Sequence, residues 1–491
     1  MNNIQNIVVN LPKSLNQIYK VINKNKLGIV FVVDNKQTLV GSISDGDIRR
    51  YLLRSQKKKI TYSSKLINKN VRYLNVNTKI SKIIEKLSSN KGILKCIPLV
   101  DKNKKIVDYS TFNNIRSFPL ALPSIGKEEI QNVNQCLNSG WISSNGQYVK
   151  KFEDLFLKTL KCKKKYATST SSGTTALELA IKSLGIGKGD EVILPNLTFG
   201  ASINSIINCG AKPIIIDIEP KTWTIDTKKI KKNLTKKTKA ILAVHLYGQP
   251  CNISELKKIS NEKKIFLIED SAESLGAKYK KKYLSIQGDA ACFSFFGNKN
   301  ITTGEGGMVL YKSEKFFKKA LIIKNHGMPV SGDYVHSLPG SNYRMTNLQA
   351  AIGCGQLKRF KMFMQIRENV FTIYNNYLKK FNDLTFLPKN TWSKNSFWLY
   401  TIKINNFSKK ERNKLVNKLK LKGIDARPVF IPLNDLMPYK RYASIKDNFS
   451  ISKKISYSSI SLPTHDLKKD DIEYICKEFI SEIIKINTNF K

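Results

Sequence analysis

From residue 126 onward, short apolar runs alternate with stretches in which apolar residues recur at helical spacing. The run AILAVHLYG at residues 240–248 predicts a buried strand, residues 253–262 predict a helix, and KIFLIED at residues 264–270 predicts the next strand. Strands that alternate with helices in this way are typical of a parallel sheet covered by helices on its faces. The sequence therefore predicts an α/β domain with a mainly parallel central sheet.

The chain is too long for a single hydrophobic core, since its 491 residues exceed the size at which cores usually stop growing. Pro119 and Pro123 lie in a short segment that separates two different patterns and indicates a linker. Near the C-terminus, WLYTIKI at residues 398–404 predicts a strand and residues 409–422 predict a helix, as in a small α+β subdomain. The predicted organisation is an N-terminal module at residues 1–114, a linker at 115–125, a large domain at 126–370 and a small subdomain at 371–491.

The N-terminal module contains a weak internal repeat. LGIVFVVDNKQTLVGSIS at residues 27–44 aligns with LKCIPLVDKNKKIVDYST at residues 94–111, and each copy predicts a strand, a polar turn and a second strand. Residues 80–87, between the two copies, have helical spacing. The pattern therefore predicts a pair of small α/β units.

The formal net charge is +47, from 84 Lys and Arg residues against 37 Asp and Glu residues. Such an excess can indicate a nucleic-acid or membrane-surface partner. The basic residues are, however, mostly Lys spread along the whole chain, and they form no Arg-rich arm. A coding bias towards Lys, Asn and Ile explains them better, so we expect neither nucleic acid nor membrane as a partner, although a positive field would help to attract an acidic substrate.

Cysteine and histidine usage indicates a reduced, metal-free protein. The eight cysteines include no C-x-x-C pair, and the four histidines form no motif with zinc-ligand spacing. The N-terminus has no signal-peptide pattern, and no apolar run reaches the ~18 residues that span a bilayer. We therefore expect a cytoplasmic protein without a bound metal.

Lys299 has unusual neighbours, because it lies in FSFFGNKNITTGEGGMVL (residues 293–310) among aromatic, polar and glycine-rich segments. An amine that forms a Schiff base with an aldehyde must be able to lose its proton, and a partly desolvated pocket lowers the pKa of a lysine in that direction. Taken alone, Lys299 would be a solvated loop lysine. Its significance depends on the other sequence segments that occur with it.

Asp270 ends the apolar strand in LIEDSAESLGA (residues 267–277). Ligands in open α/β sheets gather at the carboxyl ends of strands. A carboxylate at this position could pair with the pyridinium nitrogen of pyridoxal phosphate, whose ring then serves as an electron sink. An Asp that caps the next helix is an equally good interpretation.

A stretch rich in Ser, Thr and Gly opens a helix in TSTSSGTTALELAIKSLGIG, residues 168–187. The free N–H groups and positive dipole end of a helix attract anions, so Gly173 and Thr174 could hold a phosphate. Ordinary N-capping explains this segment equally well.

Together and in this order, the three segments resemble the DegT/DnrJ/EryC1/StrS family of sugar-nucleotide aminotransferases, which are fold-type I pyridoxal-phosphate enzymes. The resemblance covers residues 117–480 and includes GDEVILPNLTFGASINSI, VHLYGQP and NYRMTNLQAAIG. It implies pyridoxal 5′-phosphate as cofactor, Lys299 as the lysine that carries it and moves protons, and Asp270 as the partner of the ring nitrogen. Some relatives that replace this lysine with His are dehydratases, so Lys299 favours an aminotransferase.

The resemblance also implies the remaining cofactor contacts. The full set is Gly173, Thr174, Phe199, Asp270, Glu273, Ser294, Lys299 and Asn342. Phe199 would stack on the cofactor ring, although a core aromatic is the simpler interpretation of that residue alone. Glu273 stands near the cofactor hydroxyl where many members have Gln, and Leu275 stands where many have His. Asn342 would reach the phosphate from the neighbouring subunit, which implies at least a homodimer.

Among family members, the chain most resembles those that convert GDP-4-keto-6-deoxymannose to GDP-perosamine for surface polysaccharides, with glutamate as amino donor. The resemblance rests on the Lys299 segment, HLYGQPC and GIDARPVFIPL at residues 423–433. Enzymes for UDP-linked 4-keto sugars of nonulosonate pathways share much of this pattern, and a non-catalytic pyridoxal-phosphate-binding regulator is a third alternative. His326, Arg344, Arg427 and the loop at residues 139–146 are candidates for substrate binding, with ion pairs or caps as the alternative.

The N-terminal repeat resembles a tandem cystathionine-β-synthase (CBS) domain pair. Gly41, Ser44 and Asp47 match a segment that contacts adenine nucleotides in such modules, whereas an exposed acid before a basic helix is the alternative for Asp47. The second copy has Asp108, Thr111 and Asn114 at the matching places. At most one nucleotide site is therefore expected.

Overall fold

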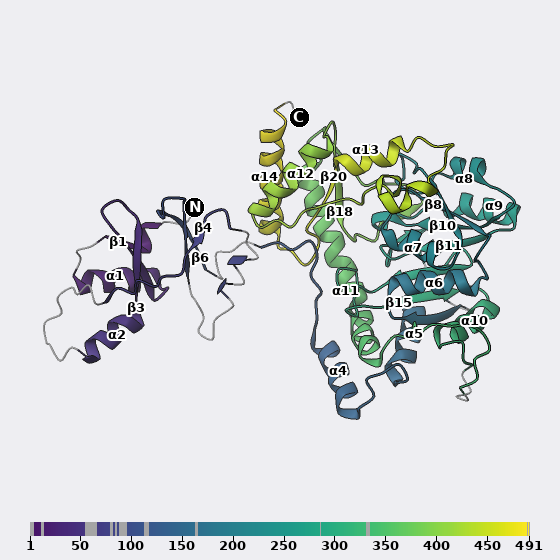
Figure 1. Ribbon diagram of the computed structural model, residues 1–491, viewed down its shortest axis with the longest axis horizontal. Coiled ribbons are helices and arrows are strands. Elements are labelled where there is room, and N and C mark those ends of the chain that lie inside the picture. Colours follow the sequence, from purple (N-terminus) through teal and green to yellow (C-terminus); the bar gives the residue numbers. More distant parts are fainter. Residues whose placement is uncertain are drawn as a thin grey trace. The chain divides into compact units, whose positions relative to one another are not determined.

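The computed structural model describes the whole chain except residues 1–3, 11–13, 55–65, 79–81, 84–85, 88–95, 112–116, 163–164, 285, 330–333, 489 and 491. Contacts between residues divide the chain into two compact units (Figure 1). One comprises Met1–Phe118 with Lys420–Gly423, and the other comprises Pro119–Leu419 with Ile424–Lys491. The finer boundaries inferred from the sequence stay predictions.

The N-terminal unit contains two strand pairs that repeat the same design. Its described elements are η1 (Ile4–Asn6), β1 (Val8–Asn10), α1 (Leu15–Asn25), β2 (Ile29–Val33), β3 (Leu39–Ser44), α2 (Asp45–Arg54), β4 (Leu74–Asn75), β5 (Ile97–Val100) and β6 (Ile106–Ser110). β2 pairs with β3 and β5 with β6, both antiparallel, and the register shifts after Val32 in one pair and after Leu99 in the other. These two positions are equivalent in the sequence repeat. The predicted strand, turn and strand are therefore confirmed in both copies.

The turns of the two copies are closed in the same way. Asp34 Oδ1 accepts hydrogen bonds from the N–H groups of Lys36 and Thr38. Asp101 Oδ1 accepts the equivalent bonds from Asn103 and Lys105. An Asp side chain that bonds to backbone N–H groups further along the chain stabilises a tight turn. In the helix predicted at residues 80–87, residues 82–83 and 86–87 are helical, and the other four lie outside the described residues.

The larger unit is built on a seven-stranded sheet of order β7-β15-β14-β11-β10-β8-β9. These strands are β7 (Tyr166–Thr170), β8 (Glu191–Pro195), β9 (Lys212–Ile216), β10 (Thr238–Val244), β11 (Phe266–Asp270), β14 (Ala290–Ser294) and β15 (Gly307–Tyr311). Neighbours from β9 to β14 pair in parallel, while β15 runs antiparallel to both β14 and β7. The mainly parallel sheet is confirmed. β10 ends earlier than predicted, because Tyr247 has a left-handed φ of 48° within a short 3-10 turn at Leu246–Gly248.

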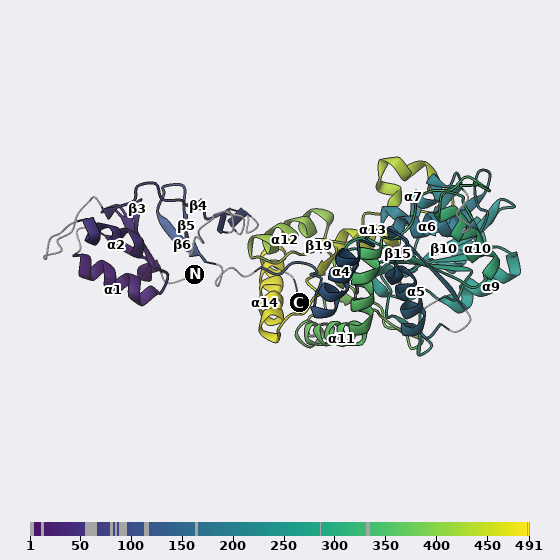
Figure 2. The same cartoon turned by 90° about the horizontal axis from the view of Figure 1, so that it is seen from below.

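Helices cover both faces of this sheet (Figures 1 and 2). They are α4 (Lys127–Ser139), α5 (Gln147–Thr159), α6 (Gly173–Ser183), α7 (Gly200–Asn208), α8 (Thr227–Asn233), α9 (Ile253–Lys263), α10 (Glu314–Lys324) and α11 (Asn347–Leu378). In β8, Val192 and Leu194 pack in the same apolar cluster as α6 and α7, whereas Ile193 packs with α9 on the opposite face. Each such fully buried side chain contributes about 1.5–3 kcal/mol.

The C-terminal part forms a separate antiparallel sheet of order β16-β18-β20-β19. Its elements are β16 (Leu384–Phe386), β18 (Tyr400–Ile404), α12 (Lys409–Leu421), β19 (Arg427–Pro428), η4 (Leu433–Asp435), η5 (Met437–Tyr442), α13 (Ser450–Ser458), β20 (Ser459–Leu462) and α14 (Lys469–Ile486). The strand predicted at residues 398–404 begins two residues later than expected. A small third sheet joins β12 (Lys278–Tyr279), β13 (Lys282–Tyr283) and β17 (Ser393–Lys394).

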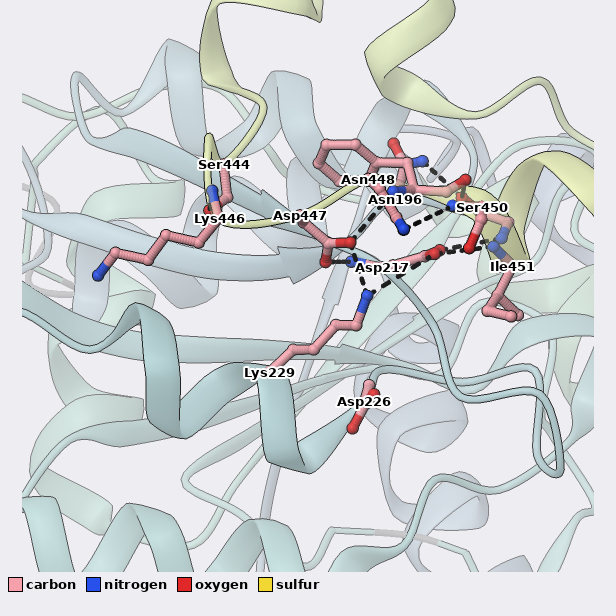
Figure 3. A network of polar contacts seen from close by, with 12 residues as sticks. Asn196, Asp217, Asp226, Lys229, Ser444, Lys446, Asp447, Asn448, Ser450 and Ile451 are labelled. Carbon is pink, nitrogen blue, oxygen red and sulfur yellow. Dashed lines mark hydrogen bonds and ion pairs between the residues drawn. The ribbon is translucent and has the colours of Figure 1, made fainter.

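A buried polar network fixes the segment before β20 to the edge strand β9 (Figure 3). Asp217, which follows β9, accepts hydrogen bonds of 2.9 Å from the N–H groups of Ile451 and Ser452 in the first turn of α13. A carboxylate at this place caps the helix and opposes its dipole. Asp447 accepts hydrogen bonds from the Asp217 N–H at 2.8 Å and from Lys229 Nζ at 2.6 Å.

Replacing Asp447 by Asn is expected to lower the free energy of unfolding by about 1–3 kcal/mol at pH 7, because Lys229 loses the closer of its two charged partners. Burial alone would raise the pKa of Asp447, but hydrogen bonds from Lys229 and the Asp217 N–H bring this pKa below its usual value. The ionised carboxylate therefore stabilises the fold above pH ~4, and this contribution is lost as the pH falls through the lowered pKa. The cost of the substitution should shrink accordingly towards pH 3.

Denaturation followed by tryptophan fluorescence measures this effect, since Trp141, Trp223, Trp392 and Trp398 all belong to the larger unit. Asp154→Asn is a matched control, because its pair with Lys150 is exposed. A cost that is the same at pH 3 and pH 7 would contradict the proposed role of the ionised Asp447.

Candidate active site

A cavity of about 370 Å³ opens at the carboxyl ends of β10, β11 and β14, beside the first residues of α6. Its size and its place in the sheet are those of a small-molecule site in an open α/β protein. The cofactor contacts expected from the sequence that line it are Gly173, Thr174, Phe199, Asp270, Glu273, Ser294 and Lys299. Segments far apart in the sequence thus meet in one cavity.

Lys299 lies in the turn that follows β14, where its N–H donates to the carbonyl of Phe296 at 2.9 Å. Its Nζ atom lies 3.8 Å from the centre of the Trp398 ring. Burial lowers the pKa of Lys299, while the carboxylates of Glu273 and Asp270 oppose this shift without cancelling it. An amine that gives up its proton more readily is suited to attack an aldehyde.

Asp270 is the last residue of β11 and is buried. Its Oδ2 accepts a hydrogen bond from the Ser202 hydroxyl at 2.7 Å, and its Oδ1 accepts one from the Ala272 N–H at 3.1 Å. Burial raises the pKa of Asp270, and these two hydrogen bonds and the charge of Lys299 counter the shift. The helix-cap interpretation is wrong, because turns follow Asp270 and no helix begins there.

The first turn of α6 combines an N-terminal cap with N–H groups beside the cavity. Ser172 caps the helix by accepting a hydrogen bond from the Thr175 N–H at 3.2 Å. The earlier N–H groups, of Gly173 and Thr174, have no partner within the helix and line the cavity. A Cβ atom on Gly173 would lie 2.7 Å from Ser294 Cβ, so glycine lets the end of β14 approach the helix start. The N-capping interpretation is therefore confirmed, and phosphate binding by Gly173 and Thr174 stays a prediction.

Aromatic side chains form one wall of the cavity. Phe199 is 63% exposed, so the core-aromatic interpretation is wrong. Its ring lies 5.7 Å from that of Phe430. Behind this wall, Tyr247 stacks between Phe430 and Trp398, at centroid distances of 5.2 and 5.8 Å. A flat ligand ring thus finds an exposed aromatic face supported by packed neighbours.

Glu273 is a second buried carboxylate beside Lys299. Its Oε2 accepts a hydrogen bond from the Tyr247 N–H at 2.6 Å, and its backbone carbonyl accepts one from the Ser396 hydroxyl at 2.6 Å. Burial raises the pKa of Glu273, and the nearby Asp270 adds to this effect. At this position the site holds a group that can carry a proton, which a glutamine cannot do.

Asn342, His326 and Arg344 lie together outside this cavity. Arg344 Nε donates to Asn342 Oδ1 at 3.2 Å, and Arg344 Nη2 lies 3.5 Å from His326 Nε2. Arg344 lines a second cavity of about 590 Å³ together with Ser144 and Asn145 of the loop at residues 139–146. Asn342, His326 and Arg344 therefore form a cluster that is separate from the Lys299 cavity.

Arg427 does not line the Lys299 cavity either. Its guanidinium makes a two-pronged ion pair with Asp425, at 2.9 and 3.1 Å. Asp425 raises the pKa of Arg427. The structure therefore favours the alternative interpretation of Arg427, in which it forms an ordinary ion pair.

In the N-terminal unit, Ser44 and Asp47 bond to each other at the start of α2. The Ser44 hydroxyl donates to Asp47 Oδ2 at 2.6 Å, and the Asp47 N–H donates back to Ser44 Oγ at 3.2 Å. Arg50 also pairs with Asp47 at 2.6 Å. At Gly41, a Cβ atom would lie 2.2 Å from a methyl group of Ile67. Helix capping thus accounts for Ser44 and Asp47, and close packing accounts for Gly41. Contact with a nucleotide stays a prediction. Asn114, in the second copy, lies outside the described residues.

Within the described part of the chain, no helix is long and apolar enough to cross a membrane. The same residues bring together no group of three or more His, Cys, Asp or Glu side chains that could hold a metal ion. All eight cysteines are free thiols.

Solved structures similar to this chain define its fold class. The putative sugar aminotransferase Spr1654 from Streptococcus pneumoniae, in its PLP form, has a TM-score of 0.72 and 29% identity, covering 76% of this chain and all of that one. PseC from Helicobacter pylori, an aminotransferase of pseudoaminic acid biosynthesis, has a TM-score of 0.70 and 25% identity, covering 75% and 100%. The larger unit is thus a fold-type I transferase.

Sequence comparison gives the family. GDP-perosamine synthase of Escherichia coli O157:H7 is 41% identical over 75% of this chain and 100% of its own length, and that of Vibrio cholerae is 39% identical over 73% and 97%. The sequence profile of the DegT/DnrJ/EryC1/StrS aminotransferase family matches residues 123–480, and that of the CBS domain matches residues 3–54. The chain belongs to the DegT/DnrJ/EryC1/StrS aminotransferase family and carries an N-terminal CBS domain. The expected activity class, a pyridoxal-phosphate-dependent sugar aminotransferase, is confirmed.

Sequence reasoning missed several residues of the site. Trp398, Phe430 and Ser202 touch the key side chains. Ser202 and Phe430 lie in two of the segments that carry the family resemblance, but neither was assigned a role. Trp398 had one signal, since it is the first residue of a predicted strand. Nothing in the order of the residues, however, reveals that it returns to Lys299 from about a hundred positions away.

Proposed function

We propose that the chain transfers an amino group from glutamate to C4 of GDP-4-keto-6-deoxymannose, giving GDP-perosamine for surface polysaccharide synthesis in the cytoplasm. The observation that carries this proposal is the identity of 38–41% to three relatives named GDP-perosamine synthase, each covered over at least 95% of its length. A field of +47 net charge favours an acidic, phosphorylated substrate.

The residues around the cavity fit pyridoxal phosphate. An amine of lowered pKa, a buried carboxylate, free helix N–H groups and an exposed aromatic face each match one part of that molecule. When bound, the cofactor supplies an aldehyde that accepts amino groups and a ring that withdraws electrons. The first α6 N–H groups and Ser294 would bind its phosphate, and Phe199 would stack on its ring.

The chain's own groups then move and hold the protons. Lys299 Nζ would bind the aldehyde carbon and, once released, carry a proton between the α-carbon of the amino donor and C4′ of the cofactor. Asp270, oriented by Ser202, would accept the hydrogen bond of the protonated ring nitrogen. Glu273 would hold a proton beside the cofactor hydroxyl. The position of all three side chains in one cavity, with both carboxylates buried, supports these roles.

We also propose that the enzyme works as a homodimer in which Asn342 serves the site of the other subunit. Asn342 lines no part of the Lys299 cavity of its own chain, and it lies with Arg344 next to a separate basic cavity. A symmetric pair of chains would place each such group at an interface. Sedimentation at several protein concentrations tests for the dimer.

A second candidate substrate is a UDP-linked 4-keto sugar. It is favoured by the structural similarity to PseC, although the identity of 25% is lower than that to the GDP-perosamine synthases. Incubating the protein with glutamate and a panel of GDP- and UDP-linked 4-keto sugars, followed by mass spectrometry, decides between the two. Amination of the UDP sugars alone would overturn the GDP proposal.

For the CBS domain we propose a regulatory role with at most one adenine nucleotide. A protein that starts at Ser117 is expected to fold and transaminate, because all residues lining the Lys299 cavity follow that position. Titration calorimetry with AMP and ATP should show binding to the full chain only. No heat of binding to the full chain would remove the nucleotide-sensor proposal. An insoluble shortened chain would make residues 1–114 part of the catalytic fold or of its oligomer.

A further inference from the structure

The free amine of Lys299 lies against an aromatic ring and not against a carboxylate. Its Nζ atom is 3.8 Å from the centre of the Trp398 ring. The other contacts of this kind, between a Lys or Arg side chain and an aromatic ring, are 4.7–5.8 Å long among the described residues. Asp270 and Glu273 line the same cavity, but they act on the amine through their charge, without a hydrogen bond to it in the described structure.

The ring suits an amine that must hold a proton and then give it up. An ammonium is attracted to the negative face of an indole, and most strongly where water is excluded. Trp398 is 4% exposed, so the contact is largely shielded from solvent. Two opposite charges in a buried site attract each other more strongly than a charge and a neutral ring do. The ring therefore holds the ammonium in place without the ion pair that would keep the proton on it.

Three contacts fix the ring beside the amine. Trp398 Nε1 donates to the carbonyl of Asn298, the residue before Lys299, at 2.9 Å. Tyr247 stacks against the ring with an angle of 17° between the two planes. Arg367, from α11, donates from Nη1 to the Trp398 carbonyl at 2.9 Å. The ring and the backbone that carries Lys299 are thus held together directly.

The backbone beside the ring adopts an unfavourable conformation at two places. Phe397, directly before Trp398, has a left-handed φ of 56°, and Tyr247 has a left-handed φ of 48°. This region is uncommon for bulky residues. Neighbouring contacts enforce it at Phe397, where the N–H donates to Asn395 Oδ1 at 2.6 Å. Because such conformations gather at functional sites, two of them beside one ring indicate that its position has a functional reason.

We propose that the Trp398 ring is the resting place of the Lys299 amine whenever that amine is free, and that it holds the ammonium between two proton transfers. This inference rests on the proposed function, in which Lys299 carries a proton. The ring forms no bond and takes no proton, so Nζ can return the proton it received. The charged groups that share the cavity with Lys299 are Asp270, Glu273 and Glu305, and a substitution of Trp398 leaves all three in the chain.

The test measures the pKa of Lys299 in the full chain freed of cofactor, where the amine is free. Trace acetylation with acetic anhydride over a range of pH follows the deprotonated amine, and mass spectrometry identifies the Lys299 peptide. Trp398→Phe keeps an aromatic face that binds cations more weakly than indole, and Trp398→Met removes the ring. Trp392→Met is the matched control, because Trp392 packs against Tyr279 at 5.3 Å and does not line the cavity.

Loss of the ring should destabilise the ammonium and so lower the pKa of Lys299. We expect its acid dissociation constant to rise about tenfold or more in Trp398→Met, by a smaller factor in Trp398→Phe, and not in Trp392→Met. The visible absorption of the lysine-bound cofactor, restored by added pyridoxal phosphate, shows that each variant is folded. An unchanged or smaller constant in Trp398→Met would overturn the proposal. If that variant does not fold, an unchanged constant in Trp398→Phe overturns it instead.

The outcome is distinguishable from failure of the proposed function. A wild-type protein that aminates no sugar nucleotide would refute that function, whereas the titration would still show whether the ring binds the amine. An active wild-type protein whose Trp398 variants keep its dissociation constant would overturn this inference alone.

Discussion

Replacing Lys299 by Ala is expected to slow transamination by about 10⁴-fold or more, the upper end of what a general acid–base group contributes. The variant loses both the amine that holds the cofactor and the group that moves the proton. The fold should survive, because the side chain lines a cavity and makes no structural hydrogen bond among those described. Single-turnover rates with glutamate and a 4-keto sugar nucleotide measure the loss.

Lys315→Ala, an exposed lysine on α10, is the matched control and should keep the wild-type rate. Small primary amines added to the Lys299→Ala protein should restore part of the activity, because they can enter the cavity and accept the proton. A Lys299→Ala protein that transaminates near the wild-type rate would show that another group is the catalytic amine.

Replacing Asp270 by Asn is expected to lower the turnover rate by about 10²–10³-fold, as for the loss of other preorganised electrostatic contacts. The uncharged amide cannot keep the ring nitrogen protonated, so the ring withdraws electrons less well. Cofactor occupancy should fall much less, since the phosphate contacts at α6 are unchanged. Activity and cofactor content measured on the same samples separate the two effects.

The hydrogen-bond partners of Asp270 should let the Asn variant lose activity without losing its local structure. The amide oxygen of the variant can still accept from the Ala272 N–H, and its NH2 group can donate to the Ser202 hydroxyl, so the side chain should stay in place. Asp154→Asn is again a suitable exposed control. Equal loss of activity and occupancy would identify Asp270 as a structural residue.

The sequence could predict those parts of the site that lie at the ends of regular elements. Asp270 ends a recognisable apolar strand, and Gly173 begins a recognisable helix, so the sheet itself brings them together. The place of Phe430 in the site could not be predicted, because it comes from a loop of the C-terminal part whose path depends on packing against Tyr247. Tyr247 in turn adopts a left-handed conformation that a strand pattern conceals.

The substrate candidates show a different limit. Charge alone made Arg427 and Arg344 plausible, but a sequence does not say whether a cation already has a partner. Arg427 is paired with Asp425, while Arg344 bonds to Asn325 and Asn342. The role of Asn342 is harder still to predict, because a contact with the cofactor of the neighbouring subunit depends on how two chains associate.

The polar network around Asp217 also protects an edge of the main sheet. β9 is the last strand in that sheet, and such edges can pair with another molecule. Here the segment that the network holds lies along β9, where Ala443 bridges to Ile215 and the Ser444 N–H donates to the Ile215 carbonyl at 3.1 Å. Loss of the network would uncover these backbone groups. Variants in which this network is weakened should therefore aggregate through the edge strand β9 while most of the core is still folded.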